Sequence, residues 1–273
     1  MRLRDLRAMA RNGEPIPVLT CYDATSAGLL DRAGVRVLLV GDSAAQMILG
    51  LPSTIHAPLD FMIRITAAVK RGAPLSFVMG DMPFMSYHAS DAEAMRNAGR
   101  FLTEGMADAV KLEVDETQVA LVEKLARAGV PVVAHIGWRP QQTVKTGTPR
   151  IAGKTAEQVR AMVELAERLD DAGAVMLLIE QATAEATQRV VAAVDVPVIG
   201  CGAGPAAHGH VIVLQDLLGM TEWHPSFAPP LAQVGEAVVK AAKQWVTRVT
   251  DGEYAAGHPF HMAGEERQRL EGG

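Results

Sequence analysis

The chain has 273 residues, of which 49% are hydrophobic and only 4% aromatic, and it carries a formal charge of −5. The length suits one α/β barrel or two domains, and an aliphatic core suits the layered interior of a (β/α)8 barrel. The chain has no basic stripe with interleaved aromatic residues and no apolar run of about 18 residues, so neither nucleic acid nor a membrane is an expected partner. Two widely separated cysteines, Cys21 and Cys201, and a charged N-terminal segment unlike a secretory signal predict a reducing, cytoplasmic location.

Short apolar runs recur along the chain and predict eight buried strands, because parallel strands are covered on both faces. In chain order the runs lie near residues 16–20, 36–40, 75–79, 109–113, 131–135, 174–179, 196–200 and 211–215. The residues between them show helical periodicity, most clearly over 58–71, 90–106 and 155–171. This βαβα order with right-handed crossovers produces a parallel sheet. Eight strands favour closure, so the predicted fold is an α/β (β/α)8 TIM barrel.

Three segments depart from the repeating pattern. The connection 201–210 is too short for a full helix, and a long helix rich in Ala and Val over 231–249 is expected to close the barrel. The segment 137–154 is rich in Gly and Pro, and long loops at a barrel mouth are more often functional than idle. No linker divides the chain, so residues 1–273 are predicted to form one barrel domain with a polar, frayed tail from about residue 262.

Four of the predicted strands run into an acidic residue, namely Asp42, Asp81, Glu113 and Glu180. In a barrel the carboxyl ends of all strands face one mouth, so these side chains are expected near one another. A carboxylate there costs free energy unless a cation, a proton or a hydrogen-bond donor meets it. Oxygen ligands without His or Cys favour Mg²⁺, which can chelate a 2-oxo acid and stabilise an enolate.

One carboxylate must stay off the metal to accept a proton, and Glu180 is the candidate base. Lys111 lies two residues before Glu113, on the same face of its strand, where its ammonium could neutralise a substrate carboxylate or an enolate oxygen. Each residue also has a structural interpretation. A single acid at a strand end is often a helix N-cap or half of a loop ion pair, Lys111 could neutralise the buried carboxylates, and His135 could be a core histidine as well as a catalytic one.

Three further motifs carry weaker predictions. His208 and His210 could bind a metal, but no third ligand is obvious and a loop is the better interpretation. The segment 200–204 resembles a phosphate-binding loop but lacks the long helix that should follow it. Cys201 lacks a base at a known spacing for a nucleophile.

Several motifs together resemble the ketopantoate hydroxymethyltransferase family, in the family's order and spacing from about residue 15 to 260. They are Leu19-Thr20-Cys21-Tyr22-Asp23, Val40-Gly41-Asp42-Ser43, Gly80-Asp81-Met82-Pro83-Phe84-Met85-Ser86-Tyr87, Val110-Lys111-Leu112-Glu113, Ala134-His135-Ile136-Gly137 with Pro140-Gln141, Ile179-Glu180, and Pro197-Val198-Ile199-Gly200 with Gly202-Ala203-Gly204. The combination is specific, whereas any one piece would not be.

The resemblance implies a (β/α)8 barrel of the phosphoenolpyruvate/pyruvate superfamily. The implied reaction moves a hydroxymethyl group from the co-substrate 5,10-methylenetetrahydrofolate to 3-methyl-2-oxobutanoate, the first committed step toward pantothenate. The residues carried over are Asp42 and Asp81 as Mg²⁺ ligands that also lie at the substrate, Glu113 as a ligand through water, Ser43 and Lys111 as contacts to the oxo acid, Glu180 as the base, and His135 beside it. The resemblance also implies a homo-oligomer, often a decamer.

The chain departs from the family around the predicted mouth. Ala44-Ala45-Gln46 stands where the family usually has Leu-Gly-Met, and the segment 147–153 differs from the usual Gly-Gly-Tyr-Lys-Val-Gln-Gly. Gln181-Ala182-Thr183 lacks the usual Pro, and His208-Gly209-His210 replaces Asp-Gly-Gln. The alternatives are therefore a specialised paralogue acting on another 2-oxo acid or one-carbon donor, a C–C or P–C lyase or mutase of the same superfamily, and a non-enzymatic binding scaffold.

Overall fold

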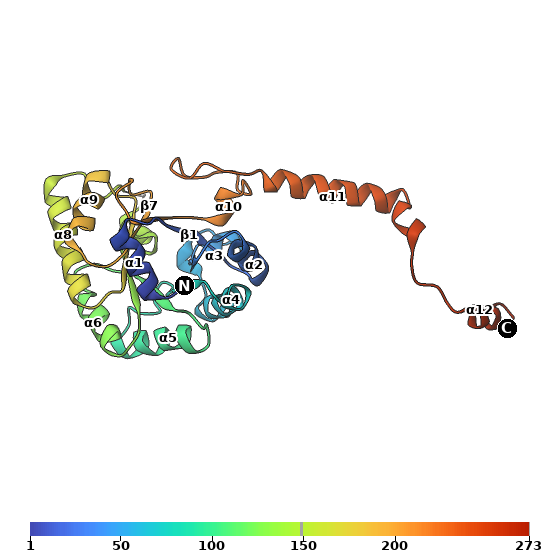
Figure 1. Cartoon of the computed structure of the whole chain (residues 1–273), viewed down its shortest axis with the longest axis horizontal. Helices are drawn as coiled ribbons and strands as arrows, with labels where there is room; N and C mark the ends of the chain where they lie inside the picture. The colour runs from blue at the N-terminus through green and yellow to red at the C-terminus, as the bar shows by residue number, and fades with distance from the viewer. Residues whose placement is uncertain (148–149, 273) are drawn as a thin grey trace.

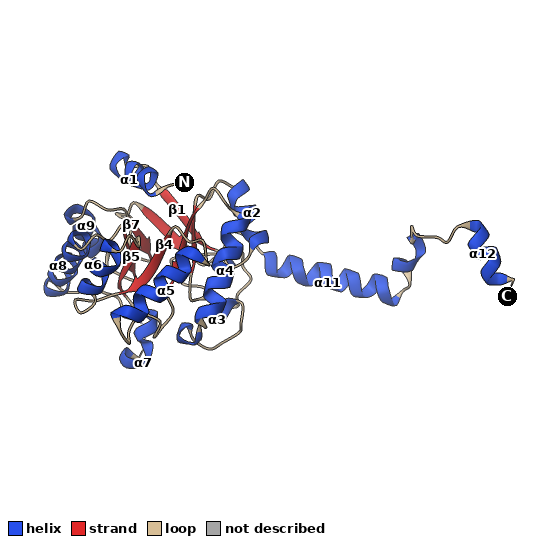
Figure 2. Ribbon diagram, turned by 90° about the horizontal axis from the view of Figure 1, so that it is seen from below, coloured by secondary structure: helices blue, strands red, loops and turns tan. Residues whose placement is uncertain are grey.

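The computed structural model describes residues 1–147 and 150–272, and its strands form one closed parallel barrel in which each strand pairs with the next. The strands are β1 (Ile16–Thr20), β2 (Val37–Val40), β3 (Phe77–Asp81), β4 (Ala109–Glu113), β5 (Val132–Gly137), β6 (Met176–Glu180), β7 (Val198–Cys201) and β8 (Gly209–Ile212). Pairing of β1 with β8 closes the ring (Figures 1 and 2). The predicted (β/α)8 fold is confirmed, with several strands shifted by a few residues from the predicted ranges.

Helices cover most of the outside of the barrel (Figure 1). They are α1 (Leu3–Asn12), α2 (Ala24–Arg32), α3 (Ala44–Met47), α4 (Leu59–Gly72), α5 (Asp91–Thr103), α6 (Val119–Arg127), α7 (Thr143–Thr146), α8 (Ala156–Asp171), α9 (Ala184–Ala193), α10 (Leu214–Leu217), α11 (Val234–Thr250) and α12 (Gly264–Glu271), with 3-10 turns η1 (Thr54–His56), η2 (Pro140–Gln142) and η3 (Glu253–Gly257). Between β7 and β8 the chain forms no helix, as the short connection 201–210 predicts.

The side chains inside the barrel change from apolar to acidic along its axis. In β3 the inward positions run from Phe77 through Met79 to Asp81, and Phe77 and Met79 belong to a buried apolar cluster inside the barrel. β6 repeats this order, with Met176 and Leu178 buried in the same cluster. Side chains alternate between the two faces of a strand, so the next inward position of each strand lies at the mouth. The acidic side chains at the ends of these strands therefore lie directly above the buried apolar cluster.

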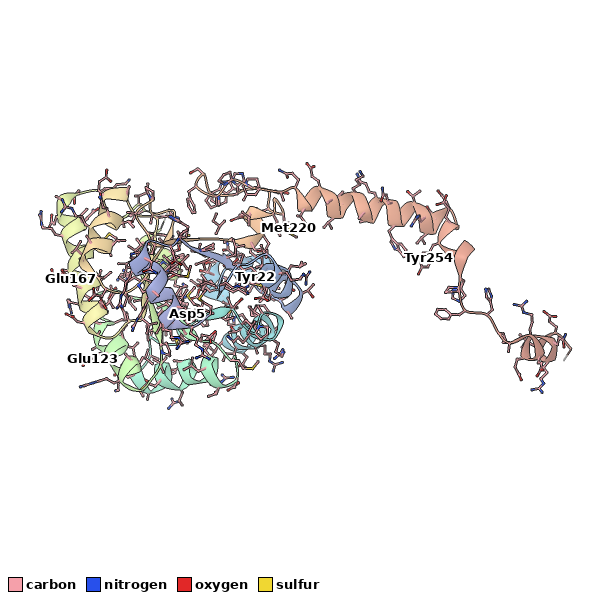
Figure 3. All side chains as sticks on the ribbon, in the orientation of Figure 1. Asp5, Tyr22, Glu123, Glu167, Met220 and Tyr254 are labelled. Carbon is pink, nitrogen blue, oxygen red and sulfur yellow. The ribbon has the colours of Figure 1, made fainter. Side chains whose placement is uncertain are left out.

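Helix α11 lies outside the barrel instead of closing it. It begins within three residues of the predicted start, but none of its residues is buried. Figures 1 and 2 show it extending away from the barrel as an arm, and Figure 3 places Tyr254 on this arm, far from Tyr22 in the barrel body. The prediction that the segment 231–249 closes this barrel is wrong, because helical periodicity identifies an apolar face but not the surface that covers it.

Two other expectations concern irregular segments. The tail that we expect to fray from about residue 262 contains the exposed helix α12. Within the segment 137–154 the chain forms η2 and α7, while residues 148 and 149, part of the altered stretch 147–153, lie outside the described residues. Over the described part of the chain, no helix is both long enough and apolar enough to cross a membrane.

Candidate active site

The predicted site residues meet in one cavity of about 410 Å³ at the carboxyl ends of the strands. Its lining includes every residue that the sequence predicts for the site, namely Asp42, Ser43, Asp81, Lys111, Glu113, His135 and Glu180. They arise from β2 to β6 and the connections that follow, so the barrel gathers residues more than 130 positions apart along the chain. Ser43 Oγ also lies 2.8 Å from the hydroxyl of Tyr22, which follows β1.

Lys111 is the cationic centre of this group. Its Nζ lies 2.9 Å from Asp81 Oδ1, and the two side chains are only 5% and 1% exposed. Asp81 in turn accepts a hydrogen bond at its Oδ2 from the backbone N–H of Asp42, over 2.9 Å. Burial raises the pKa of Asp81 to about 7 despite the opposing effect of Lys111. An ion that supplies further positive charge here would lower that pKa again.

His135 is held neutral beside Lys111. Burial and the neighbouring ammonium lower the pKa of His135 well below its usual value. Lys111 Nζ lies 3.2 Å from His135 Nδ1, and because an ammonium can only donate, Nδ1 is the acceptor. The ring proton is then on Nε2, which lies 3.5 Å from Glu180 Oε2. His135 thus connects the cation to the predicted base.

Glu180 differs from the other carboxylates in its exposure and in its distance from a cation. Its side chain is 18% exposed toward the cavity, whereas those of Asp81 and Glu113 are 1% exposed. Burial raises the pKa of Glu180 to about 8, and Lys111 only partly offsets this effect. A carboxyl group with a pKa near neutrality, free of a direct cation contact, is suited to accept a proton from carbon.

The donor set fits a hard divalent cation with open positions. Asp42 and Asp81 offer carboxylate oxygens at the ends of the neighbouring strands β2 and β3, and the buried Asp81 Oδ1 already accepts positive charge from Lys111 Nζ over 2.9 Å. Over residues 1–147 and 150–272, no three His, Cys, Asp or Glu side chains converge as a complete ligand cluster. Two inner carboxylates, with water and substrate oxygens completing the shell, match the way proteins usually hold Mg²⁺.

Several residues in or directly behind the cavity carry no role predicted from the sequence. Gln141 and Tyr87 occur in the motifs that resemble the family, but the spacing of those motifs indicates no role for either residue. Both are buried, Gln141 against the carboxylates of Asp42 and Glu113 and Tyr87 against Gln141. Asp216, in α10, lines the cavity and accepts a hydrogen bond from Thr221 Oγ1 over 2.8 Å. Trp223 also lines the cavity, from a loop whose sequence carries no recognisable motif.

The weaker motifs do not form a second site. His208 Nδ1 accepts a hydrogen bond from the Val198 N–H over 3.0 Å, and His210 is exposed on the outer face of β8, so the two rings do not share a ligand. Cys201 lies beside Glu180 in the sheet register, and burial raises its thiol pKa well above the usual value, which leaves it a poor nucleophile.

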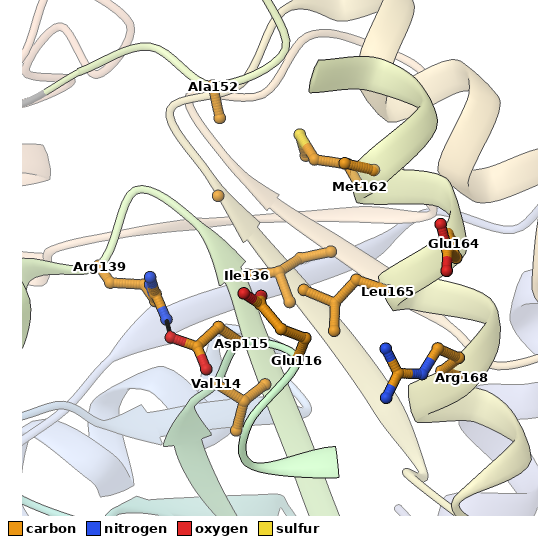
Figure 4. A pocket seen from close by; sticks show the side chains of 12 residues that line it. Val114, Asp115, Glu116, Ile136, Arg139, Ala152, Met162, Glu164, Leu165 and Arg168 are labelled. Carbon is orange, nitrogen blue, oxygen red and sulfur yellow. Dashed lines mark hydrogen bonds and ion pairs between the residues drawn. The ribbon is translucent and has the colours of Figure 1, made fainter. Parts of the chain in front are cut away.

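A second cavity, also of about 410 Å³, lies between α8 and the segments at the ends of β4 and β5 (Figure 4). Its charged groups include Arg139, whose Nη1 donates to Asp115 Oδ2 over 2.6 Å, as Figure 4 marks. It is lined by none of the residues that the sequence predicts for the site. The residues predicted for the site therefore all line the first cavity and not this one.

Comparison with known proteins agrees with this geometry. The family model described as ketopantoate hydroxymethyltransferase matches residues 1–257. The 3-methyl-2-oxobutanoate hydroxymethyltransferase of Pyrobaculum aerophilum is 43% identical over 90% of this chain and 94% of its own, and that of Geobacillus kaustophilus is 41% identical over 98% and 97%.

Solved structures show the same fold at lower identity. The phosphoenolpyruvate phosphomutase of Streptomyces platensis subsp. rosaceus superposes with a TM-score of 0.61 at 16% identity, covering 100% of this chain and 96% of its own. A 2,3-dimethylmalate lyase gives 0.58 at 19% identity, covering 99% and 94%. The family match over nearly the whole chain and the close relatives decide the assignment: the chain is an enzyme of the ketopantoate hydroxymethyltransferase family, and hence a transferase.

Proposed function

We propose that the protein transfers a hydroxymethyl group from 5,10-methylenetetrahydrofolate to 3-methyl-2-oxobutanoate, giving 2-dehydropantoate, with Mg²⁺ as cofactor. The observation that carries this proposal is that the cavity contains two separate groups, one that is charged and one that can accept a proton. Asp42, Asp81 and Lys111 form one charged group, and Glu180, with a pKa of about 8, faces the same space without a direct contact to a cation. Proton removal from carbon beside a keto group needs such a pair of functions.

The oxo acid would bind between these groups. A cation held by Asp42 and Asp81, with Glu113 acting through water, would draw electron density from the keto oxygen and lower the cost of the enolate. Lys111 and Ser43 would hold the substrate through charge and hydrogen bonding. Lining side chains of Leu178 and Val211 supply apolar surface for the branched alkyl group.

Glu180 would then take the proton from the carbon next to the keto group. The enolate carbon forms a bond to the methylene carbon of the folate, the two bonds from that carbon to nitrogen break, and water supplies the hydroxyl oxygen. The Nε2–H of His135, 3.5 Å from Glu180 Oε2, would orient the carboxylate toward the substrate. This role rests on the neutral state of the His135 ring.

The experiment that tests the proposal supplies several 2-oxo acids, each with methylenetetrahydrofolate or with free formaldehyde. We expect 2-dehydropantoate from 3-methyl-2-oxobutanoate and the folate, and loss of product on chelation of Mg²⁺. Product formed only from another oxo acid, or only from formaldehyde, would replace the proposal with the specialised paralogue. Cleavage of a C–C or P–C bond without either donor would indicate a lyase or mutase, and absence of any turnover a binding scaffold.

We also propose that the protein assembles with further copies of itself through α11; the resemblance implies a decamer. The helix carries an apolar stripe that no described residue covers, formed by Val238, Val239, Trp245, Val246 and Val249, each at least 50% exposed. These positions repeat with helical spacing, so they share one side of the helix. A stripe of this size on a helix away from its own barrel favours a partner surface.

The barrel offers the complementary surface. No helix follows β7, and only the four-residue α10 directly follows β8. In the register of β1 and β8, Pro17 lies opposite His210, and both are exposed on the outside, where parallel barrels normally carry a covering helix. Leu29 of the neighbouring α2 is 54% exposed. A second copy's α11 would fill this gap.

Charge placed on the stripe should weaken the assembly. We expect the double variant Val238→Glu, Trp245→Glu to have a lower molar mass than the wild type by light scattering after size exclusion, because burying two carboxylates opposes association. The double variant Gln244→Glu, Thr247→Glu adds the same charge on the opposite side of α11 and should keep the wild-type mass. A monomeric wild type, or equal masses for both variants, would contradict the role of the stripe.

A further inference from the structure

Gln141 is a buried side chain that links three of the strand ends around the site. It lies in η2 after β5 and is 1% exposed. Its Nε2 donates to Asp42 Oδ2 and to the carbonyl oxygen of Met82, each over 3.0 Å. Its backbone N–H lies 3.2 and 3.1 Å from the two carboxylate oxygens of Glu113. One residue thus contacts two of the carboxylates that lack a direct bond to Lys111, those of Asp42 and Glu113.

Tyr87 lies on the oxygen side of the Gln141 amide and supports its orientation. Its hydroxyl lies 2.8 Å from Gln141 Oε1, and it accepts a hydrogen bond from the Glu113 N–H over 3.2 Å. Because the oxygens of Asp42 and Met82 only accept, the amide NH₂ of Gln141 faces them. The Gln141 oxygen then faces the Tyr87 hydroxyl, whose one proton has the Glu113 carbonyl oxygen, at 3.2 Å, as a second acceptor. A flipped amide would bring three acceptor oxygens together at Asp42 and Met82, which costs free energy in a buried site.

We propose that Gln141 is a positioning residue that holds the carboxylates of Asp42 and Glu113 ready for a divalent cation, with Tyr87 supporting the orientation of its amide. The inference rests on the proposed function, since it concerns the same Mg²⁺ site. The hydrogen bond to Asp42 Oδ2 leaves Oδ1 available to a ligand and prevents rotation of the carboxylate. Hydrogen bonds to ligating groups of this kind commonly change metal affinity by about 10–100-fold.

Gln141 neither binds nor deprotonates the substrate in the proposed reaction. Among the described residues that it contacts are the acids Asp42 and Glu113 and the hydroxyl of Tyr87, and Lys111 and Glu180 are not among its hydrogen-bond partners. A loss of metal affinity without loss of the fold therefore separates a positioning role from a merely structural one.

The test measures binding of Mg²⁺ alone by titration calorimetry on the full chain. We expect Gln141→Met, which keeps the length but removes the amide, to weaken Mg²⁺ binding about 10–100-fold. Gln141→Glu keeps the bond from Tyr87 but presents an acceptor to Asp42, so it should not restore binding at neutral pH. Tyr87→Phe, which removes one oxygen, should weaken binding less than Gln141→Met.

The matched control is Gln118→Met. Gln118 Oε1 accepts a hydrogen bond from the Asp115 N–H over 2.9 Å, outside the group of carboxylates, so this variant should bind Mg²⁺ like the wild type. Thermal unfolding confirms that each variant is folded. Variants that bind Mg²⁺ as tightly as the wild type would overturn the inference and leave the proposed function standing. A wild type that binds no Mg²⁺ would overturn both the inference and the metal in the proposed function.

Discussion

Replacement of Glu180 by Gln is expected to abolish exchange of the proton beside the keto group of 3-methyl-2-oxobutanoate in deuterated water, with a loss of at least about 10³-fold. The amide keeps the shape of the carboxylate but cannot accept the proton. Binding of the oxo acid, measured by titration in the presence of Mg²⁺, should persist because Lys111 and the Asp42–Asp81 pair are unchanged. Exchange at the wild-type rate would remove Glu180 from the role of base.

The same variant should be more stable than the wild type at alkaline pH. The folded-state pKa of Glu180 is about 8, above the ordinary value of 4.5, so the stability associated with its protonated form is lost as pH rises through about 8. The substitution leaves Gln141 and its partners unchanged. The new amide at position 180 stays neutral at every pH, so it avoids the free-energy cost of a buried charge. We expect a gain of about 1–3 kcal/mol at pH 9 relative to pH 5, measured by denaturant unfolding at both pH values.

Glu164→Gln is the control for both measurements. Glu164 lies on α8 and lines the second cavity, not the cavity that holds the predicted site residues. The variant should exchange the substrate proton at the wild-type rate and show no gain in stability between pH 5 and pH 9. If the free energy of unfolding depended on pH in the same way for Glu180→Gln and Glu164→Gln, the buried charge of Glu180 would not destabilise the folded protein.

The sequence identifies the charged layer well because a strand has a simple period. Asp81 and Lys111 stand next to each other in the β3–β4 register, and Glu113 stands opposite His135 in the β4–β5 register. Both pairings follow once the strands and the barrel closure are predicted, since inward positions alternate and neighbouring strands run parallel. The location of the site could therefore be predicted from the strand ends alone.

The contributions of the loops could not be predicted in this way. Gln141 reaches Asp42 from 99 positions along the chain, through a 3-10 turn whose direction depends on Gly137 and its φ of +89°. A Cβ at Gly137 would lie 2.4 Å from the Glu180 carbonyl oxygen, so the turn begins where the backbone of β6 leaves no room for a side chain on β5. Nothing in the spacing of the sequence encodes that close approach or the contact that follows from it.

The placement of α11 was missed for a different reason. The pattern of Val238, Trp245 and Val249 predicts an amphipathic helix, and the structure has one there. The pattern contains no information on whether the covering surface belongs to the same chain or to another. In the described part of the chain, the exposed outer face at Pro17 and His210 marks a place where no helix covers the barrel.

Replacement of Lys111 by Met should have the second large effect, on stability as well as activity. Lys111 is the cation nearest the buried Asp81, with 2.9 Å between Nζ and Oδ1, and removal of one partner of a buried ion pair typically costs about 3–5 kcal/mol. The loss should be greatest at alkaline pH. Without the ammonium the pKa of Asp81, already about 7, rises further, so lower pH protonates the acid and removes the unpaired charge.

Denaturant unfolding of Lys111→Met at pH 5 and pH 9 measures this dependence, and Lys70→Met provides the comparison. Lys70 Nζ pairs with Asp108 over 2.6 Å, but these side chains are 19% and 31% exposed, so the control should lose only about 1 kcal/mol and keep its activity. Mg²⁺ should restore part of the stability of Lys111→Met at pH 9, because a divalent cation beside Asp81 replaces the lost positive charge. A loss that is the same at both pH values and indifferent to Mg²⁺ would show that Lys111 contributes through the packing of its alkyl chain, and not as the counter-charge on which the arrangement of acids depends.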